Sequence, residues 1–323
     1  MNQYYFNDEL NIKDITEKSV DFIVITHPDQ DHTIGIKKVL ENFSVKKIYM
    51  NRPWKYVDDL FDKINDGRIT KESLARRLRE KYKTIADIED MAKEKNIPIY
   101  EAFEGTHIED ELLILSPEKQ YYLSLLVSSE KTPLEMSSAL QHDGTLLKFL
   151  ASVKDFALNI LETWDIETLR ESETTSAENE TSVILRGKVD GSGFILTGDA
   201  GIGSLNRAID YMEKIGENIV EDISFYQVPH HGGRHNVSPS VLNRMLGEKI
   251  EKGNSRNKVA FASVAQNSSH PLKMVTNAYI RRGVTVYKTN GNVICHHNGK
   301  MPDRRWVGLK SIEFSDYVEE WSN

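Results

Sequence analysis

Cysteine is almost absent from this sequence of 323 residues, which contains only Cys295. A single cysteine excludes an internal disulfide and is typical of the reducing cytosol, so we expect a cytoplasmic protein. Cys295 ends the strand-like run Val293-Ile294-Cys295. In that setting a small core hydrophobe is a more common role for cysteine than a nucleophile, and we expect the former.

Long apolar runs are also missing. No stretch approaches the roughly 20 apolar residues that a membrane-spanning helix requires. The opening residues, Met1-Asn2-Gln3-Tyr4-Tyr5, lack the basic and apolar regions of a signal peptide. We therefore expect no membrane partner. With 39% hydrophobic and 28% charged residues, the chain can bury a substantial core.

Positive charge is in deficit, because 41 Lys and Arg residues face 49 Asp and Glu residues, for a net charge of −8. This balance speaks against broad, sequence-independent wrapping of nucleic acid. It does not exclude a phosphate-bearing substrate, because bound divalent metals would invert the local field. The basic segment from Lys71 to Lys83, with Arg76, Arg77 and Arg79, is either a solvated amphipathic helix or a phosphate-facing patch.

Four potential metal ligands lie within six residues of one another. The run Phe22-Ile23-Val24-Ile25 predicts a short buried strand, and it leads directly into Thr26-His27-Pro28-Asp29-Gln30-Asp31-His32. Imidazole and carboxylate groups are common zinc ligands, and a carboxylate-rich set also suits manganese. A polar turn that only caps a helix needs one such residue, so we predict a metal site.

Two further predicted strands end in residues of the same kind. Asp199 follows Phe194-Ile195-Leu196-Thr197-Gly198, and His230-His231 follow the strand from Ile223 to Val228. Repeated units of strand, polar residue and helix bring distant side chains to one edge of a sheet. His270, before Pro271, follows the next strand and is a candidate for the same site or a surface residue. We interpret the other histidines as structural or surface residues: His107, His142, His235, His296 and His297.

The rest of the pattern predicts a scaffold with two helical segments, at residues 52–96 and 121–178, and a single domain over residues 1–323. A helix is expected from Ile34 to Phe43, and a loop from Arg170 to Glu180. A hairpin is expected around Asp190-Gly191. Helices are expected from Ile202 to Ile215 and from Pro239 to Lys252, each followed by a strand.

These motifs resemble the metallo-β-lactamase superfamily, and most of all the hydrolase domain of the competence protein ComEC and its stand-alone relatives. The resemblance rests on five motifs in the right order. They are residues 26–32, Asn179-Glu180-Thr181-Ser182, residues 194–200, residues 228–233 and His270-Pro271. It implies an α/β fold of the αββα sandwich type with a dinuclear metal site. The family has two or three strands before the His-rich loop, so we expect the N-terminal strands to be missing or shortened.

By position, the resemblance places His27 and Asp29 on one ion and Asp31 and His32 on a second, with Asp199 between the two. His230 or His231 would complete the second site. Of the two, we predict His230 as the ligand and His231 as a catalytic residue. Asn179 and Ser182 stand where the family has another histidine, which makes the first site richer in oxygen. The two divalent ions would be Zn²⁺ or Mn²⁺.

The expected activity is metal-assisted hydrolysis, with Asp31 accepting a proton from water and His231 or His270 serving the leaving group. The leading hypothesis is a phosphodiesterase or nuclease acting on DNA or RNA. The alternatives are a hydrolase of small esters, lactones or nucleotides, and a non-catalytic subunit of a larger assembly. An uncovered N-terminal sheet edge predicts a homo-oligomer or a partner protein.

Overall fold

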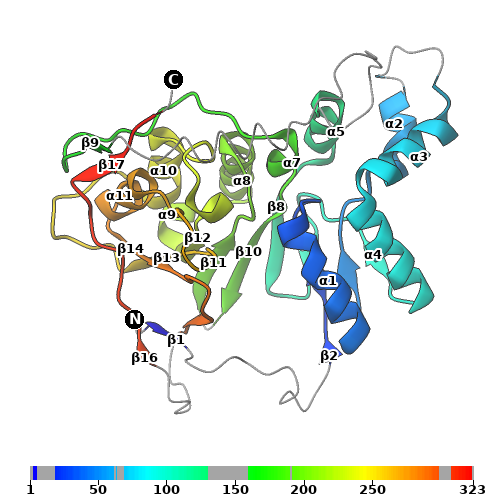
Figure 1. Cartoon of the computed structure of the whole chain (residues 1–323), viewed down its shortest axis with the longest axis horizontal. Helices are drawn as coiled ribbons and strands as arrows, with labels where there is room; N and C mark the ends of the chain where they lie inside the picture. Colours follow the sequence, from blue (N-terminus) through cyan, green and yellow to red (C-terminus); the bar gives the residue numbers. More distant parts are fainter. Residues whose placement is uncertain are drawn as a thin grey trace.

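The computed structural model describes residues 3–5, 19–61, 63, 69–129, 159–189, 191–297 and 307–321. These residues form four layers, in the order helices, sheet, sheet, helices (Figure 1). The layers agree with the predicted αββα sandwich.

The smaller sheet is parallel. β3 (Ile23–Val24) pairs with β5 (Ile48–Tyr49), which pairs with β6 (Ile99–Tyr100), while β2 (Ser19–Val20) pairs with β4 (Ser44–Val45). Successive side chains in a strand point to opposite faces. Accordingly Ile23 and Ile48 pack against the helices, whereas Tyr49 packs toward the larger sheet. Within the described residues β3 is an edge strand of its sheet.

Helices cover the outer face of this sheet, as predicted for residues 52–96. They are α1 (Gln30–Asn42), α2 (Val57–Phe61), α3 (Lys71–Lys81), α4 (Lys83–Glu94) and α5 (Lys119–Ser128), with a 3₁₀ turn, η2, at Pro53–Tyr56. In α3, Arg79 binds both carboxylate oxygens of Asp90 at 2.7 and 2.8 Å and also pairs with Glu89. Arg76 lies near Glu80 one turn on. These pairs favour the amphipathic-helix interpretation of the basic segment over a phosphate-facing patch.

In the part of the chain that the structure describes, the larger sheet has seven strands in the order β14-β13-β12-β11-β10-β8-β7. Their bounds are β7 His107–Ile108, β8 Leu112–Ser116, β10 Ile184–Val189, β11 Ser192–Leu196, β12 Ile223–Gln227, β13 Lys258–Ala262 and β14 Val284–Lys288. β10 and β11 form the predicted antiparallel hairpin, and β11 to β14 are parallel to one another. The carboxyl ends of these parallel strands therefore share one edge, which is where the polar motifs follow.

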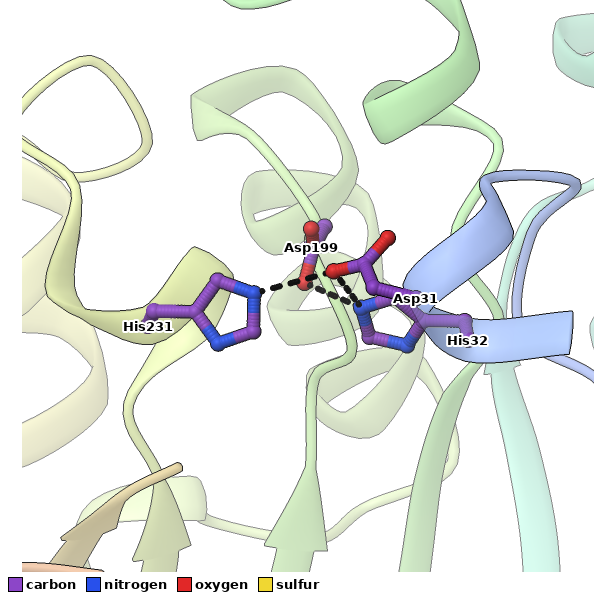
Figure 2. A group of neighbouring side chains, drawn as sticks. All are labelled: Asp31, His32, Asp199 and His231. Atoms are coloured by element: carbon purple, nitrogen blue, oxygen red, sulfur yellow. Dashed lines mark hydrogen bonds and ion pairs between the residues drawn. The ribbon is translucent and has the colours of Figure 1, made fainter. Parts of the chain in front are cut away.

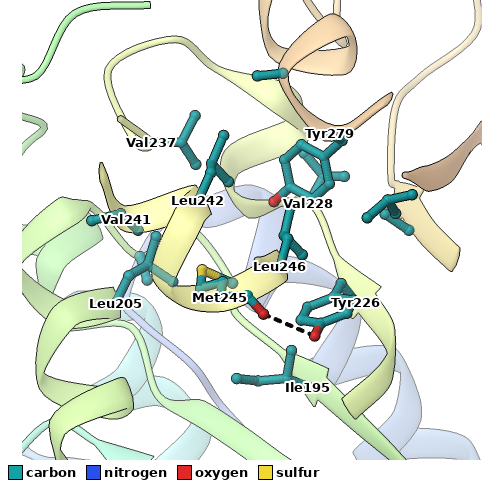
Figure 3. Packing of buried hydrophobic residues seen from close by; sticks show 14 of the residues in the cluster. Ile195, Leu205, Tyr226, Val228, Val237, Val241, Leu242, Met245, Leu246 and Tyr279 are labelled. Atoms are coloured by element: carbon teal, nitrogen blue, oxygen red, sulfur yellow. Dashed lines mark hydrogen bonds between the residues drawn. The ribbon is translucent and has the colours of Figure 1, made fainter. Parts of the chain in front are cut away.

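The second helical layer comprises α8 (Ile202–Lys214), α9 (Ile219–Asp222), α10 (Pro239–Leu246) and α11 (Lys273–Arg281). Figure 3 shows how Leu242 and Leu246 of α10 pack toward Tyr226 and Val228, and all four side chains are buried. The Tyr226 hydroxyl donates to the Met245 carbonyl at 3.0 Å, which satisfies this polar group within the core.

A third, small core lies between the two sheets. It contains Tyr49 from the smaller sheet and Ile114, Val183 and Leu185 from the larger one. The amide of Val183 also donates to the carbonyl of Thr26 at 3.0 Å. This bond ties the strand before the first His-rich motif to the sheet that carries Asp199, so the two halves of the site are held together.

The structure corrects several boundaries. Ile160 was predicted to be helical but lies in β9 (Asn159–Leu161), because the C-terminal strand β17 (Tyr317–Glu319) pairs with it. Residues 130–158, which form the middle of the predicted helical segment 121–178, lie outside the described residues. The helix predicted to reach Lys252 ends at Leu246, because Gly247 adopts a φ of 93°. Part of the loop predicted at 170–180 is a short helix, α7 (Ala177–Glu180), with Glu178 and Asn179 buried.

The described N-terminal residues form a small separate sheet. β1 (Gln3–Tyr5) pairs with β15 (Ile294–His296) and with β16 (Val307–Gly308). Cys295 is half-buried in β15 and belongs to none of the three hydrophobic cores, contrary to the prediction of a core residue. None of the described helices combines the length and apolar character needed to cross a bilayer.

Candidate metal centre

The first motif straddles the start of a helix. His27 follows β3, and α1 already begins at Gln30 with Asp29 at its N-cap position, four residues before the predicted start at Ile34. Asp31 and His32 therefore project from the first turn of α1. The hydroxyl of Thr33 donates to the Asp29 carbonyl at 2.9 Å, which fixes this turn. A helix N-terminus also favours negative charge, so it stabilises the carboxylate of Asp31.

Asp199 is presented by a tight turn after β11. Gly198 before it has a φ of 53°, and a Cβ atom there would lie 3.1 Å from Cβ of Thr26 and 3.3 Å from Cβ of Ser182. Both the left-handed backbone and the close approach require glycine. The turn leaves Asp199 only 2% exposed, facing the first motif.

The two histidines after β12 occupy unusual backbone conformations. His230 and His231 lie in the 3₁₀ turn η3 (Pro229–Gly232) with φ values of 46° and 57°. Left-handed residues other than glycine are uncommon and cluster at functional sites. Nδ1 of His231 lies 2.6 Å from the carbonyl oxygen of Ser263. A hydrogen bond from Nδ1 to that carbonyl leaves the Nε2 lone pair available as a ligand.

Four of these side chains converge on one point. Asp31, His32, Asp199 and His231 each offer one ligand atom, and these atoms all lie within 4.8 Å of one another (Figure 2). Nε2 of His231 is 3.2 Å from Oδ2 of Asp31, and Nε2 of His32 is 3.1 Å from Oδ1 of Asp199. Such mixed imidazole and carboxylate groups suit a divalent metal ion.

A second group of side chains faces the other oxygen of Asp199. Oδ2 of Asp199 lies 2.5 Å from Nδ1 of His230 and 3.7 Å from Nε2 of His27. The same His27 nitrogen is 3.9 Å from Oδ2 of Asp29. Asp199 thus lies between the two groups, with one oxygen toward each, which is the position that sequence resemblance gave it.

Ser182 links His27 to Asp199. Its hydroxyl lies 3.3 Å from Nδ1 of His27 and accepts a hydrogen bond from the Asp199 amide at 3.1 Å. The Thr26 hydroxyl is also 3.0 Å from Nδ1 of His27. These contacts orient the buried imidazole so that Nε2 faces the carboxylates. Ser182 therefore positions two of the candidate ligands, His27 and Asp199.

The donor atoms fit a metal ion by a further criterion. Across the described residues, Nε2 of His27 and Nε2 of His32 are buried without a hydrogen-bond partner. Buried polar atoms are nearly always paired, and each unpaired one costs roughly 1–3 kcal/mol. These two imidazole nitrogens make no hydrogen bond, and they face the carboxylates of Asp29, Asp31 and Asp199. A bound metal ion would give both nitrogens a partner.

The histidines of the site differ in the direction of their pKa shifts. Burial, together with the charge of His32, lowers the pKa of His27 to about 4, so His27 is a neutral imidazole at physiological pH. Burial opposes charge on His32, but Asp199 outweighs it and raises the pKa of His32. Hydrogen bonding to Asp199 likewise raises the pKa of His230. Burial alone would raise the pKa of Asp199, but its close contacts with the imidazoles of His230 and His32 lower it strongly.

The two remaining predicted residues lie beside this centre. Nδ2 of Asn179 is 2.7 Å from the Thr175 hydroxyl and 3.4 Å from Nδ1 of His230. The half-buried His270 belongs to the loop before α11, which is joined to the His-His turn by a bond from the Leu272 amide to the Gly232 carbonyl. Burial and the charges of His230 and His231 lower the pKa of His270.

The Ser263 carbonyl was not anticipated from the sequence, because a backbone acceptor leaves no residue-type signal. Its position was nevertheless implied, since it directly follows β13, whose end lies beside that of β12 in the parallel sheet. His235, expected to be a surface or structural residue, is exposed and pairs with Glu173 at 2.7 Å.

Comparison with known families finds a match for the N-terminal part of the chain. The model of the metallo-beta-lactamase superfamily matches residues 3–98, a span that contains the motif from His27 to His32. This segment is therefore similar to that superfamily, which consists largely of hydrolytic metalloenzymes. A search of curated proteins found no match. The family match and the His/Asp cluster together indicate a metal-dependent hydrolase.

Proposed function

We propose that this protein is a two-metal phosphodiesterase of the ComEC-like type that acts on DNA or RNA. The observation that carries the proposal is the position of Asp199, whose two carboxylate oxygens face two different groups of ligands. A shared carboxylate between two such groups suits a pair of ions.

The ligands divide naturally between the two groups. His27, Asp29 and His230 would hold one ion, and Asp31, His32 and His231 the other, with Asp199 shared. This assignment differs from the sequence-based one in placing His231, rather than His230, among the ligands of the second group. When bound, two divalent ions would polarise the phosphoryl oxygens and lower the pKa of water. Each ion would then have two imidazoles and two carboxylates, counting the shared Asp199, and such a mixed set of ligands suits Zn²⁺ or Mn²⁺.

The remaining chemistry is assigned to two side chains at the opening. The Asp31 side chain is 58% exposed at the edge of the cluster, so it is accessible to solvent and can accept a proton from the attacking water. His270 is half-buried beside His230 and His231, and its lowered pKa keeps it neutral near pH 7. A neutral imidazole retains one N–H, which can donate a hydrogen bond to the leaving oxygen.

A small-molecule hydrolase is the second candidate. It is favoured by the pairing of Arg79 in α3 with Glu89 and Asp90, because those pairs withdraw cationic charge from polyanion binding. Such an enzyme would hydrolyse small esters, lactones or nucleotides without the strong salt dependence of polynucleotide binding.

The test is cleavage of labelled single- and double-stranded DNA and of RNA, in Mn²⁺ and in Zn²⁺, with bis(p-nitrophenyl) phosphate as a small phosphodiester. Asp31→Ala and Asp199→Ala should abolish cleavage. His107→Ala, which alters an exposed histidine of the edge strand β7, is the control and should retain it. Turnover of the small ester alone would favour the second candidate. No turnover of any substrate would leave a non-catalytic subunit.

We also propose that the edge at β3 is covered by a second copy of the chain or by a partner protein, since uncovered edges favour strand pairing. Sedimentation equilibrium of the purified protein tests this. A monomer with no partner in a pull-down would contradict it.

A further inference from the structure

Two arginines stack on one tryptophan close to the metal centre. The guanidinium carbon of Arg170 lies 4.4 Å from the ring centroid of Trp321, and that of Arg234 lies 4.6 Å from it. The indole nitrogen of Trp321 donates to the Thr168 carbonyl at 2.9 Å, so the ring is anchored. We call Arg170 and Arg234 the arginine pair. Stacking of this kind holds each guanidinium in a fixed plane.

The arginine pair is held in place by one backbone carbonyl and by one carboxylate at a longer distance. Nη1 of Arg234 donates to the backbone carbonyl of Glu320 at 2.8 Å. Nη1 of Arg170 lies 3.6 Å from Glu173, and the Arg170 side chain is 51% exposed. A guanidinium has five donors in its plane, and stacking covers only its face. The N–H groups along the edge can therefore still bind a planar or tetrahedral anion.

Arg234 of the arginine pair is close in the chain to the metal centre, and Trp321 joins Arg170 to it. Arg234 is three residues after His231, so their Cα atoms are at most about 11 Å apart. The intervening chain turns tightly, with the Gly233 amide donating to the His230 carbonyl at 2.9 Å.

We propose that Arg170 and Arg234 form a phosphate subsite that binds a phosphodiester group next to the one being hydrolysed. This inference rests on the proposed function and specifies its substrate as a nucleic-acid strand with at least two phosphates. Arginine is the residue best suited to bidentate phosphate binding. The Trp321 ring is already in contact with both guanidinium groups, so this contact would be made through the phosphate rather than through base stacking.

The subsite also reconciles a nucleic-acid substrate with a chain of net charge −8. Acidic side chains flank the pair, including Glu173 beside Arg170 and Glu171 beside Ser240. These carboxylates would repel a long stretch of polyanion. The arrangement therefore favours one or two local phosphate contacts over extended backbone binding, which needs broad basic surfaces.

The experiment measures binding of a fluorescent single-stranded oligonucleotide over a series of salt concentrations, with chelator present so that no hydrolysis occurs. Arg170→Gln and Arg234→Gln should each weaken binding about tenfold, the effect of one lost charge-assisted contact. Each should also reduce the slope of log Kd against log salt by about 0.7. Arg244→Gln on α10 is the matched control and should change neither quantity, because Arg244 pairs with Asp210 and Glu213.

The two arginines lie in different segments, so misfolding of one loop would not explain an equal loss of affinity in both variants. Thermal melts of each variant check its folding. Unchanged affinity and slope in both arginine variants would overturn the subsite, as would equal losses in Arg244→Gln. If the wild type cleaves no phosphodiester but both arginine variants bind the oligonucleotide more weakly, the subsite is supported and the proposed function is contradicted. If the wild type cleaves phosphodiesters and both variants bind as well as it does, the proposed function is supported and the subsite is contradicted.

Discussion

The Nε2 atom of His231 lies 3.2 Å from a carboxylate oxygen of Asp31, although 200 positions separate the two residues in the sequence. Asp31 is presented by the first turn of α1 and His231 by the turn after β12. The contact therefore forms only when the two sheets have packed together. Metal binding at this point should stabilise the folded protein, because the unfolded chain holds no such site.

The two adjacent histidines should differ in their effect on metal affinity. His231→Asn removes a member of the four-ligand group, so we expect Zn²⁺ affinity to fall by at least about 100-fold, more than for loss of a supporting contact. His230→Asn should instead weaken binding of the other ion, the one held with His27 and Asp29, because His230 faces the other oxygen of Asp199. Isothermal titration calorimetry with each variant would separate the two. A His231→Asn protein that titrates like the wild type would contradict the assignment.

Ser182 should affect the metal centre without touching the ion. Ser182→Ala removes the hydroxyl that contacts His27 and the Asp199 amide, so both would be held less firmly. Supporting contacts of this kind are worth about 10–100-fold in metal affinity, and we expect a loss in that range. Competition against a chromogenic chelator measures it. Ser124→Ala, which alters an exposed hydroxyl of α5, should leave the affinity unchanged.

Gly198→Ala should destabilise the fold for two separable reasons. The left-handed backbone at Gly198 costs about 1–2 kcal/mol for any residue with a Cβ atom, and the new atom would lie 3.1 Å from Thr26. Gly216 also has a positive φ, but a Cβ there meets nothing within 4 Å. Urea denaturation of both variants should show a larger loss for Gly198→Ala. Equal losses would mean that the close approach to Thr26 has no energetic effect.

Acid stability should depend on Glu167. This buried carboxylate lies 2.9 Å from Arg282 and 2.8 Å from Lys249. Burial alone would raise its pKa, but these cations lower it below the ordinary value of 4.5. The unfolded chain therefore binds the proton more tightly, so the stabilising contribution is present above pH 4.5 and is lost as pH falls through the lower folded pKa.

Glu167→Gln should accordingly cost about 3–5 kcal/mol at pH 7, because it leaves Arg282 buried without its carboxylate. The difference from the wild type should shrink as pH falls below 4.5 and through the lower folded pKa, where the wild-type carboxylate becomes protonated as well. Glu313→Gln, which alters an exposed ion pair with Lys310, should cost less than about 1 kcal/mol at any pH. Chemical denaturation at a series of pH values checks both. A constant difference between pH 7 and pH 3 would contradict the linkage.

Much of the fold and of the site could be predicted because its signals are local. An apolar strand followed by His and Asp residues marks a sheet edge, and this pattern located His27, Asp199 and His231. The structure brings each of these predicted residues into one cluster or its immediate surroundings. Amphipathic spacing similarly located α8 and the α3–α4 segment.

What could not be predicted depends on contacts between distant segments. The choice between His230 and His231 depends on two left-handed backbone conformations and on the Ser263 carbonyl, none of which the residue types reveal. Ile160 has apolar spacing that fits a helix, but pairing with Val318 of the C-terminal strand makes it part of a sheet. Likewise, the stacking of Arg170 and Arg234 on Trp321 joins three separate segments.

The two-metal site is tested most directly by the metal content of the purified protein, measured by inductively coupled plasma mass spectrometry alongside Asp199→Ala and His107→Ala. We expect about two divalent ions per chain in the wild type and in His107→Ala, as is usual for a two-metal hydrolytic site. Asp199→Ala should lose most of this metal, because both groups of ligands share its carboxylate. A wild-type protein that binds no divalent metal, even after incubation with Zn²⁺ or Mn²⁺, would contradict the central claim.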